Sequence, residues 1–297
     1  MNYSIKILIG FLFLSIVFSC KAQKIQSNDF TAEFSFTKGI EGPAVDAIGN
    51  LYAVNFQVEG TIGVVDEKGN GSIFATLPEG SIGNGIRFDT NGDMYIADYK
   101  GHNVLSVKKG SKEVLVWAHN SEMNQPNDLA IAPNGIIYLS DPNWADSTGK
   151  IWMVNKTKEI VLLAENLGTV NGIEVSPNGT KLYINESIQR NIWEYDIKPD
   201  GTITNKQKFI SFTDFGMDGM RCDDKGNLYI TRYDKGTVVI VSAAKKILKE
   251  VQLKGKKPSN ITFGGPEGKT CFVTMADRGC FETFEALNSG AFYKRIH

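Results

Sequence analysis

Two carboxylates and four side-chain amides recur along this sequence at nearly equal intervals. They open six similar phrases whose starts are 43, 43, 44, 47 and 42 residues apart. Sets that offer only oxygen donors select hard cations, and a rigid ring of them suits Ca²⁺ better than Mg²⁺. The chain has only 3 histidines, so a histidine-rich zinc or iron site is not supported. The six residues are Glu41, Asn84, Asn127, Asn171, Asp218 and Asn260.

The phrases that follow these residues are internal repeats. Residues 84–98 repeat the pattern of residues 41–55, and shorter copies begin at 127, 171, 218 and 260. Short runs rich in β-branched and aromatic residues, such as 136–140, 151–154 and 159–163, alternate with turns such as Pro133-Asn134-Gly135, in which Asn and Gly supply positive φ. A period in the forties with several short strands is typical of a propeller blade. We therefore predict an all-β, six-bladed β-propeller over residues 30–297.

The ends of the repeat array are expected to meet. The last repeat runs out soon after Phe284, and a strand-like segment at residues 30–36 precedes the first repeat. We predict that this segment completes the last blade, because closure removes the exposed sheet edges of an open array. A two-sheet sandwich is the alternative, and six copies in phase argue against it.

The propeller explains how the six spaced residues act together. Each begins the innermost strand of a blade, so all six converge on one mouth of the central channel. Asparagine at strand starts has a simple structural explanation, since it satisfies backbone groups. The two acids do not, because carboxylates that face each other repel and one takes up a proton. We predict one divalent cation between Glu41 and Asp218, best satisfied by Ca²⁺ and compatible with another divalent ion.

Several of these motifs resemble a known family. Glu41-Gly42-Pro43, Pro126-Asn127-Asp128, Asn171-Gly172, Asp218-Gly219 and the closing stretch 277–284 are similar, in order, to motifs of the gluconolactonase/regucalcin (senescence marker protein) family. The resemblance covers about residues 35–285. It implies a calcium-dependent hydrolase that opens a lactone, and we expect that lactone to be sugar-derived. Asp218 is then expected to act as the base for water, to attack the carbonyl directly, or only to ligate the ion. The resemblance implies these calcium ligands: Glu41, Asn127, Asn171 and Asp218.

Polar residues at the ends of the second strands are expected to rim the pocket. Arg232 is the most suggestive, since its guanidinium suits an anionic sugar acid. Many family members carry a basic residue two positions before the third-blade asparagine, where this chain has Gln125. That departure favours a neutral lactone or another ester. The expected substrate-binding residues are Gln125, Asp141, Trp144, Glu186 and Arg232, on a rim that also includes Asn55, Asp98, Asp277, Tyr99 and Tyr233.

The first residues read as a targeting segment. Lys6 precedes an apolar run at 7–18 that is too short to span a bilayer, and Val17-Phe18-Ser19-Cys20 resembles a bacterial lipobox. We predict a signal peptide at 1–19, lipidation of Cys20, a tether at 20–29, and anchoring to the bacterial cell envelope, at the outer membrane or facing the periplasm. The alternative is an ordinary signal peptide and a soluble secreted protein.

Composition limits the partners. The net charge is −1 without a basic patch, so nothing indicates nucleic acid, and the predicted membrane contact is the lipid anchor alone. Cys222, Cys271 and Cys280 are interpreted as small buried hydrophobes. Besides a small lactone, the site suits a phosphotriester or aryl ester. A propeller that only binds, with a structural cation, is the remaining alternative.

Overall fold

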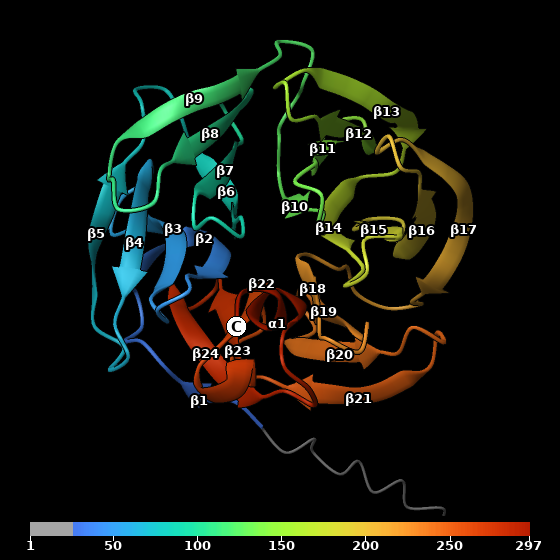
Figure 1. Ribbon diagram of the computed structural model, residues 1–297. Helices are drawn as coiled ribbons and strands as arrows, with labels where there is room; N and C mark the ends of the chain where they lie inside the picture. The colour runs from blue at the N-terminus through green and yellow to red at the C-terminus, as the bar shows by residue number, and fades with distance from the viewer. Residues whose placement is uncertain (1–25) are drawn as a thin grey trace, which may run out of the picture.

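The computed structural model describes residues 26–297 and confirms the six-bladed propeller. Within this range the strands form six four-stranded antiparallel sheets arranged around a central channel (Figure 1). Three blades follow one another from the N-terminal side. They are β2 (Phe36–Val45), β3 (Leu51–Phe56), β4 (Thr61–Val65) and β5 (Gly71–Thr76); β6 (Gly83–Phe88), β7 (Met94–Asp98), β8 (Asn103–Val107) and β9 (Val114–His119); and β10 (Leu129–Ile131), β11 (Ile137–Asn143), β12 (Thr148–Val154) and β13 (Ile160–Leu167).

Three further blades complete the ring. In each, the chain runs from the innermost strand outward, so the first strand of every repeat lines the channel. The sixth blade takes its outer strand, β1, from the N-terminal side. The blades are β14 (Val170–Val175), β15 (Lys181–Glu186), β16 (Asn191–Ile197) and β17 (Ile203–Ser211); β18 (Met220–Cys222), β19 (Leu228–Arg232), β20 (Thr237–Val241) and β21 (Ile247–Gln252); and β22 (Pro258–Gly264), β23 (Thr270–Met275), β24 (Cys280–Glu285) and β1 (Asn28–Asp29).

The predicted closure is confirmed, but the predicted closing strand was misplaced. Asn28 and Asp29 pair with Thr283 and Glu282 of β24. Residues 30–35 form a loop, and residue 36 already belongs to β2. The aromatic residues that suggested a strand serve packing instead, since the Phe30 ring lies edge-on to Phe272 at 4.9 Å. The propeller therefore begins inside the segment that was predicted to be the tether.

Turns and packing follow from the repeat. In the turn at residues 133–135, glycine alone takes positive φ (85°), and the Asn134 side chain accepts a hydrogen bond from the Ile136 amide instead. Apolar side chains from facing sheets fill the space between blades, as with Ile151 and Ile184, which are fully buried in one cluster. Cys222, Cys271 and Cys280 are free and buried, which confirms that they are core residues.

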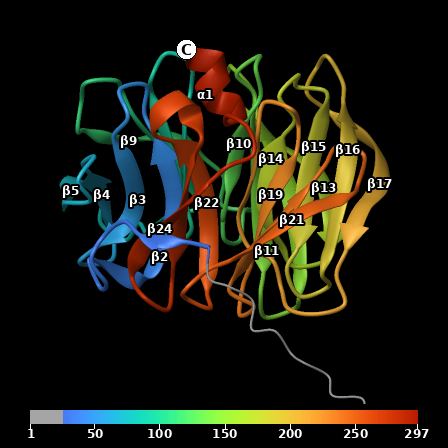
Figure 2. The ribbon, with the colours of Figure 1, turned by 90° about the horizontal axis from the view of Figure 1, so that it is seen from below.

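Two short helical segments lie outside the blade pattern. They are η1 (Pro266–Gly268) and α1 (Ala291–Ile296), and α1 lies over one mouth of the channel (Figure 2). The sequence does not predict α1, because six residues are too few for a helical periodicity. Between residues 26 and 297 no helix has the length and apolar character needed to cross a membrane. The predicted signal peptide and Cys20 lie outside the described residues.

Candidate cation and substrate site

Glycine residues bring the inner strands close enough for the six ring residues to converge. Four of the six are followed directly by glycine, at 42, 85, 172 and 219. A Cβ on Gly219 would lie 2.0 Å from Cγ of Asn260, and one on Gly172 would lie 2.4 Å from the carbonyl oxygen of Asp218. Each glycine thus packs against the ring residue of the next blade, where only a bare Cα fits.

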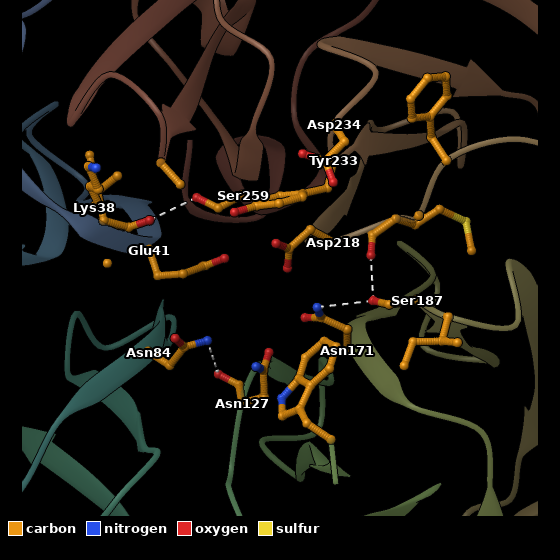
Figure 3. A pocket seen from close by; sticks show the side chains of 18 of the residues that line it. Lys38, Glu41, Asn84, Asn127, Asn171, Ser187, Asp218, Tyr233, Asp234 and Ser259 are labelled. Atoms are coloured by element: carbon orange, nitrogen blue, oxygen red, sulfur yellow. Dashed lines mark hydrogen bonds between the residues drawn. The ribbon is translucent and has the colours of Figure 1, made fainter. Parts of the chain in front are cut away.

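The ring residues open into a cavity of about 670 Å³ at the mouth of the channel opposite α1. Glu41, Asn127, Asn171 and Asp218 all line it, and Figure 3 shows their side chains reaching toward a common space. The structure therefore brings together the four residues that the family resemblance implied as ligands. Glu41 is buried, whereas Asp218 keeps part of its surface open to the cavity.

Oxygen atoms at the centre of the ring are left without protein partners. The buried Oδ1 of Asn127 has no hydrogen-bond partner within residues 26–297. Nδ2 of Asn171 donates to Oγ of Ser187 at 3.2 Å, which leaves its Oδ1 available. Oε2 of Glu41 accepts from the Gly42 amide at 2.6 Å, and no described residue donates to Oε1. Such a set fits Ca²⁺, which takes about 6–8 oxygen ligands, so four side chains leave positions for water and substrate.

The other two ring residues have different roles. Nδ2 of Asn84 donates to the main-chain oxygen of Asn127 at 2.9 Å, so it positions a neighbouring ring residue. Nδ2 of Asn260 donates to Oε2 of Glu41 at 2.9 Å, while its Oδ1 accepts from Arg221 at 3.2 Å. Asn260 therefore holds Glu41 in place and does not line the cavity, whereas Asn84 positions Asn127 and lies outside the ligand set that the family resemblance implied.

The electrostatics of the ring also favour a cation. Burial and the nearby Asp128 charge raise the pKa of Glu41 to about 7. Burial, together with the Glu41 charge, raises the pKa of Asp218 well above its ordinary value. The two neighbouring acids resist ionisation because their negative charges repel. A divalent cation between them would stabilise both in the ionised form. In the described range no group of three or more His, Cys, Asp or Glu is arranged to hold a metal ion, so a site here depends on amide oxygens beside two carboxylates.

Beneath the ring lies a buried ion-pair network that the sequence analysis missed. Asp128, with a side chain 1 % exposed, contacts Arg87 at 2.9 Å and Arg221 at 3.5 Å, and Arg87 lies 3.6 Å from Glu174. Arg87, Glu174 and Arg221 each lie three residues after a ring residue, and this regular spacing could have indicated that they meet in the channel. The network supports the ring, because Arg221 orients Asn260 against Glu41.

Several expected substrate-binding residues do not line the cavity. The buried Asp141 carboxylate accepts hydrogen bonds from the main-chain N–H of Gln125 at 2.6 Å and from the indole N–H of Trp152 at 2.8 Å. Glu186, also buried, accepts from the Gly168 amide at 2.9 Å. Neither acid lines the cavity, and neither does Gln125. These polar strand ends hold the loop that enters each blade, and Asn55, Asp98 and Asp277 do the same.

Arg232 likewise does not reach the cavity. Its buried guanidinium donates to the carbonyl oxygens of Asp214 at 2.6 Å and Phe215 at 3.3 Å, and it lies 3.8 Å from the centre of the Phe212 ring. The expectation that it contacts substrate is replaced by a positioning role, since it fixes the loop that leads into Asp218.

Residues one step beyond these strand ends do line the cavity. Tyr99 follows Asp98, Ser187 follows Glu186, and Tyr233 follows Arg232. Trp144 also lines the cavity, and it was expected on the rim together with Tyr99 and Tyr233. Burial and the charge of Asp218 raise the pKa of Tyr233 to about 12, so its phenol stays neutral and can donate a hydrogen bond. Further residues that line the cavity were not predicted from the sequence: Lys38, Ser187, Ile188, Arg190, Phe215, Met217, Asp234 and Ser259.

Comparison with known proteins places this geometry in context. Residues 39–277 match the protein family described as the SMP-30/gluconolactonase/LRE-like region. A gluconolactonase of Zymomonas mobilis is 27% identical over 65% of this chain, and the match spans 60% of that relative's length. A diisopropyl-fluorophosphatase of Loligo vulgaris is 25% identical over 88% of this chain and 93% of its own. A calcium-binding regucalcin from Agrobacterium tumefaciens has the same fold, with a TM-score of 0.76, 19% identity, and 90% and 99% of the two chains covered.

Proposed function

Because the chain belongs to the SMP-30/gluconolactonase/LRE-like family, we propose that it is a calcium-dependent hydrolase that opens a lactone ring. The observation that carries the proposal is the pair Glu41 and Asp218, which line one cavity together with the unpartnered Oδ1 of Asn127. A gluconolactonase is among its relatives, which supports a cyclic ester as substrate.

The proposed chemistry divides among named side chains. A bound Ca²⁺ would act as a Lewis acid that polarises the ester carbonyl. Asp218 faces the cavity and is the carboxylate we assign to accept a proton from the attacking water. Glu41, held by the Gly42 amide and Asn260, stays a ligand, and Asn127 and Asn171 orient ion and substrate. Tyr233 offers a neutral O–H to the developing negative charge.

A phosphotriester is the second candidate substrate. The diisopropyl-fluorophosphatase relative aligns over most of its own length. A cation held by the four candidate ligands would polarise a phosphoryl oxygen as well as a carbonyl oxygen. An aryl ester belongs to the same class of electrophile.

The test is acid release from a panel of lactones, with phosphotriesters and aryl esters alongside. Protein treated with a chelator is compared with the same sample after calcium is restored. We expect lactone turnover that disappears with the chelator and returns with calcium. A tightly bound calcium without turnover of any panel member would favour a propeller that only binds.

Calcium should stabilise the folded protein more at pH 8 than at pH 5.5. Without a cation, Glu41 and Asp218 have raised pKa values, so between their ordinary pKa values and about pH 7 the folded state holds more protons than the unfolded chain. Their contribution to stability therefore falls as the pH rises. A cation that replaces these protons adds about 2.7 kcal/mol at a hundredfold excess over Kd.

Thermal unfolding at both pH values, with and without calcium, measures this effect. A calcium-induced increase in Tm that is equal at both pH values, or larger at pH 5.5, would show that these carboxylates do not bind the ion.

A further inference from the structure

One side of the cavity exposes apolar side chains. Trp144, Ile188 and Phe215 line it and are 39%, 49% and 46% exposed. They come from three successive parts of the ring: Trp144 between β11 and β12, Ile188 between β15 and β16, and Phe215 between β17 and β18. Large apolar residues that gather on one cavity wall mark a contact with a ligand more than a scattered surface residue does. We call these three residues the apolar wall.

The wall is built rather than incidental. Phe215 adopts φ 37°, a left-handed conformation that a bulky residue rarely takes without a constraint. The constraint is Arg232, which donates to the carbonyl oxygens of Asp214, Phe215 and Gly216 from a fully buried position. A side chain that is held in a costly conformation and left exposed to the cavity is typical of a functional residue.

The wall adjoins the candidate ligands directly. Ile188 follows Ser187, whose hydroxyl contacts both Asn171 and the carbonyl oxygen of Met217. Phe215 lies three residues before Asp218 on the same loop. Because Ile188 and Phe215 line the same cavity as Asp218, a substrate bound there can place a substituent against them. Across the ring, the opening of the first blade contributes the exposed cation Lys38 instead (Figure 3).

We propose that the substrate is a lactone or ester that carries an apolar alkyl or aromatic substituent, which lies against Trp144, Ile188 and Phe215. The proposal rests on the hydrolase function proposed above and narrows its substrate class. An unsubstituted or fully hydroxylated lactone leaves the wall exposed to water, so the substituent provides the additional binding.

The test compares δ-lactones of one ring size, with and without an alkyl chain, and includes a sugar δ-lactone. We expect wild-type kcat/KM to favour the alkyl-substituted lactone by about 10-fold or more, the order expected for a few methylenes in an apolar pocket. Phe215→Ala and Ile188→Ala should each reduce that selectivity ratio several-fold. Leu115→Ala, at an equally exposed leucine on the outer strand β9, should not change it.

Equal activity on all lactones, or a ratio that survives both wall substitutions, would overturn the proposal. Misfolding lowers both rates together and leaves the ratio unchanged, so it cannot imitate the expected result. Calorimetry with the corresponding lactams, which are not turned over, separates the two proposals. Tighter binding of the alkyl lactam by wild type but not by Phe215→Ala, without lactone hydrolysis, would support the wall and refute the hydrolase. Hydrolysis without any preference for the alkyl chain would support the hydrolase and refute the role of the wall.

Discussion

Replacing Asp218 with asparagine is expected to lower lactone turnover by at least about 100-fold, the lower limit for loss of a general base. Asparagine keeps the size and one oxygen of the side chain but cannot accept a proton from water. The loss should appear in kcat at saturating calcium, because the ring retains the oxygen atoms of Glu41, Asn127 and Asn171. Initial rates over a calcium titration give the measurement.

Asn84→Ala is the matched control for this substitution. Asn84 occupies an equivalent position in the ring and also lines the cavity, but its amide binds a main-chain oxygen. Its loss should reduce activity far less. Full turnover by Asp218→Asn with calcium bound would contradict the catalytic role and leave Asp218 only a possible ligand.

Replacing Asp128 with alanine is expected to destabilise the fold by about 3–5 kcal/mol, the usual cost of leaving buried partner charges uncompensated. Asp128 is the carboxylate between Arg87 and Arg221. Burial already lowers the pKa of Arg221 to about 10, which indicates how unfavourable its charge is in the channel. Chemical denaturation of the calcium-free protein measures the free energy of unfolding.

The control is an ion pair at the surface. Lys181 and Asp196 are 36% and 38% exposed, and such pairs contribute at most about 1 kcal/mol, so Asp196→Ala should cost little. Equal costs for the two substitutions would show that the channel network does not stabilise the fold. A second consequence is weaker calcium binding in Asp128→Ala, since Arg221 would no longer be held where it orients Asn260 against Glu41.

The fold and the ring were predictable because both repeat. A blade period in the forties is visible in a single sequence, and the first residue of each repeat must lie at the channel. The closing strand was harder to locate. Phe30 and the residues after it read as a strand by composition, yet the pairing residues are the polar Asn28 and Asp29. Pairing at a sheet edge depends on backbone geometry that composition does not reveal.

The rim was predicted in part: Tyr99, Trp144 and Tyr233 line the cavity as expected, whereas the polar strand ends do not. Asp141 and Glu186 have the chemistry of substrate-binding residues. Each instead accepts a hydrogen bond from a main-chain N–H in the loop that enters its blade. A polar residue at a strand end can face solvent or satisfy a loop, and the sequence pattern is the same for both. Phe215 was not predicted as a site residue, because nothing in its sequence context marks it. The structure shows that it lines the cavity, on a loop that Arg232 holds.

Calcium binding to the ring is tested most directly by isothermal titration of the cation-free protein. We predict one site per chain, with affinity reduced at least about tenfold by Glu41→Gln and by Asp218→Asn, since each removes a charged ligand. Asp196→Ala, at the surface, should bind calcium as well as wild type. Stoichiometric binding that survives both carboxylate substitutions would place the ion elsewhere and contradict the site.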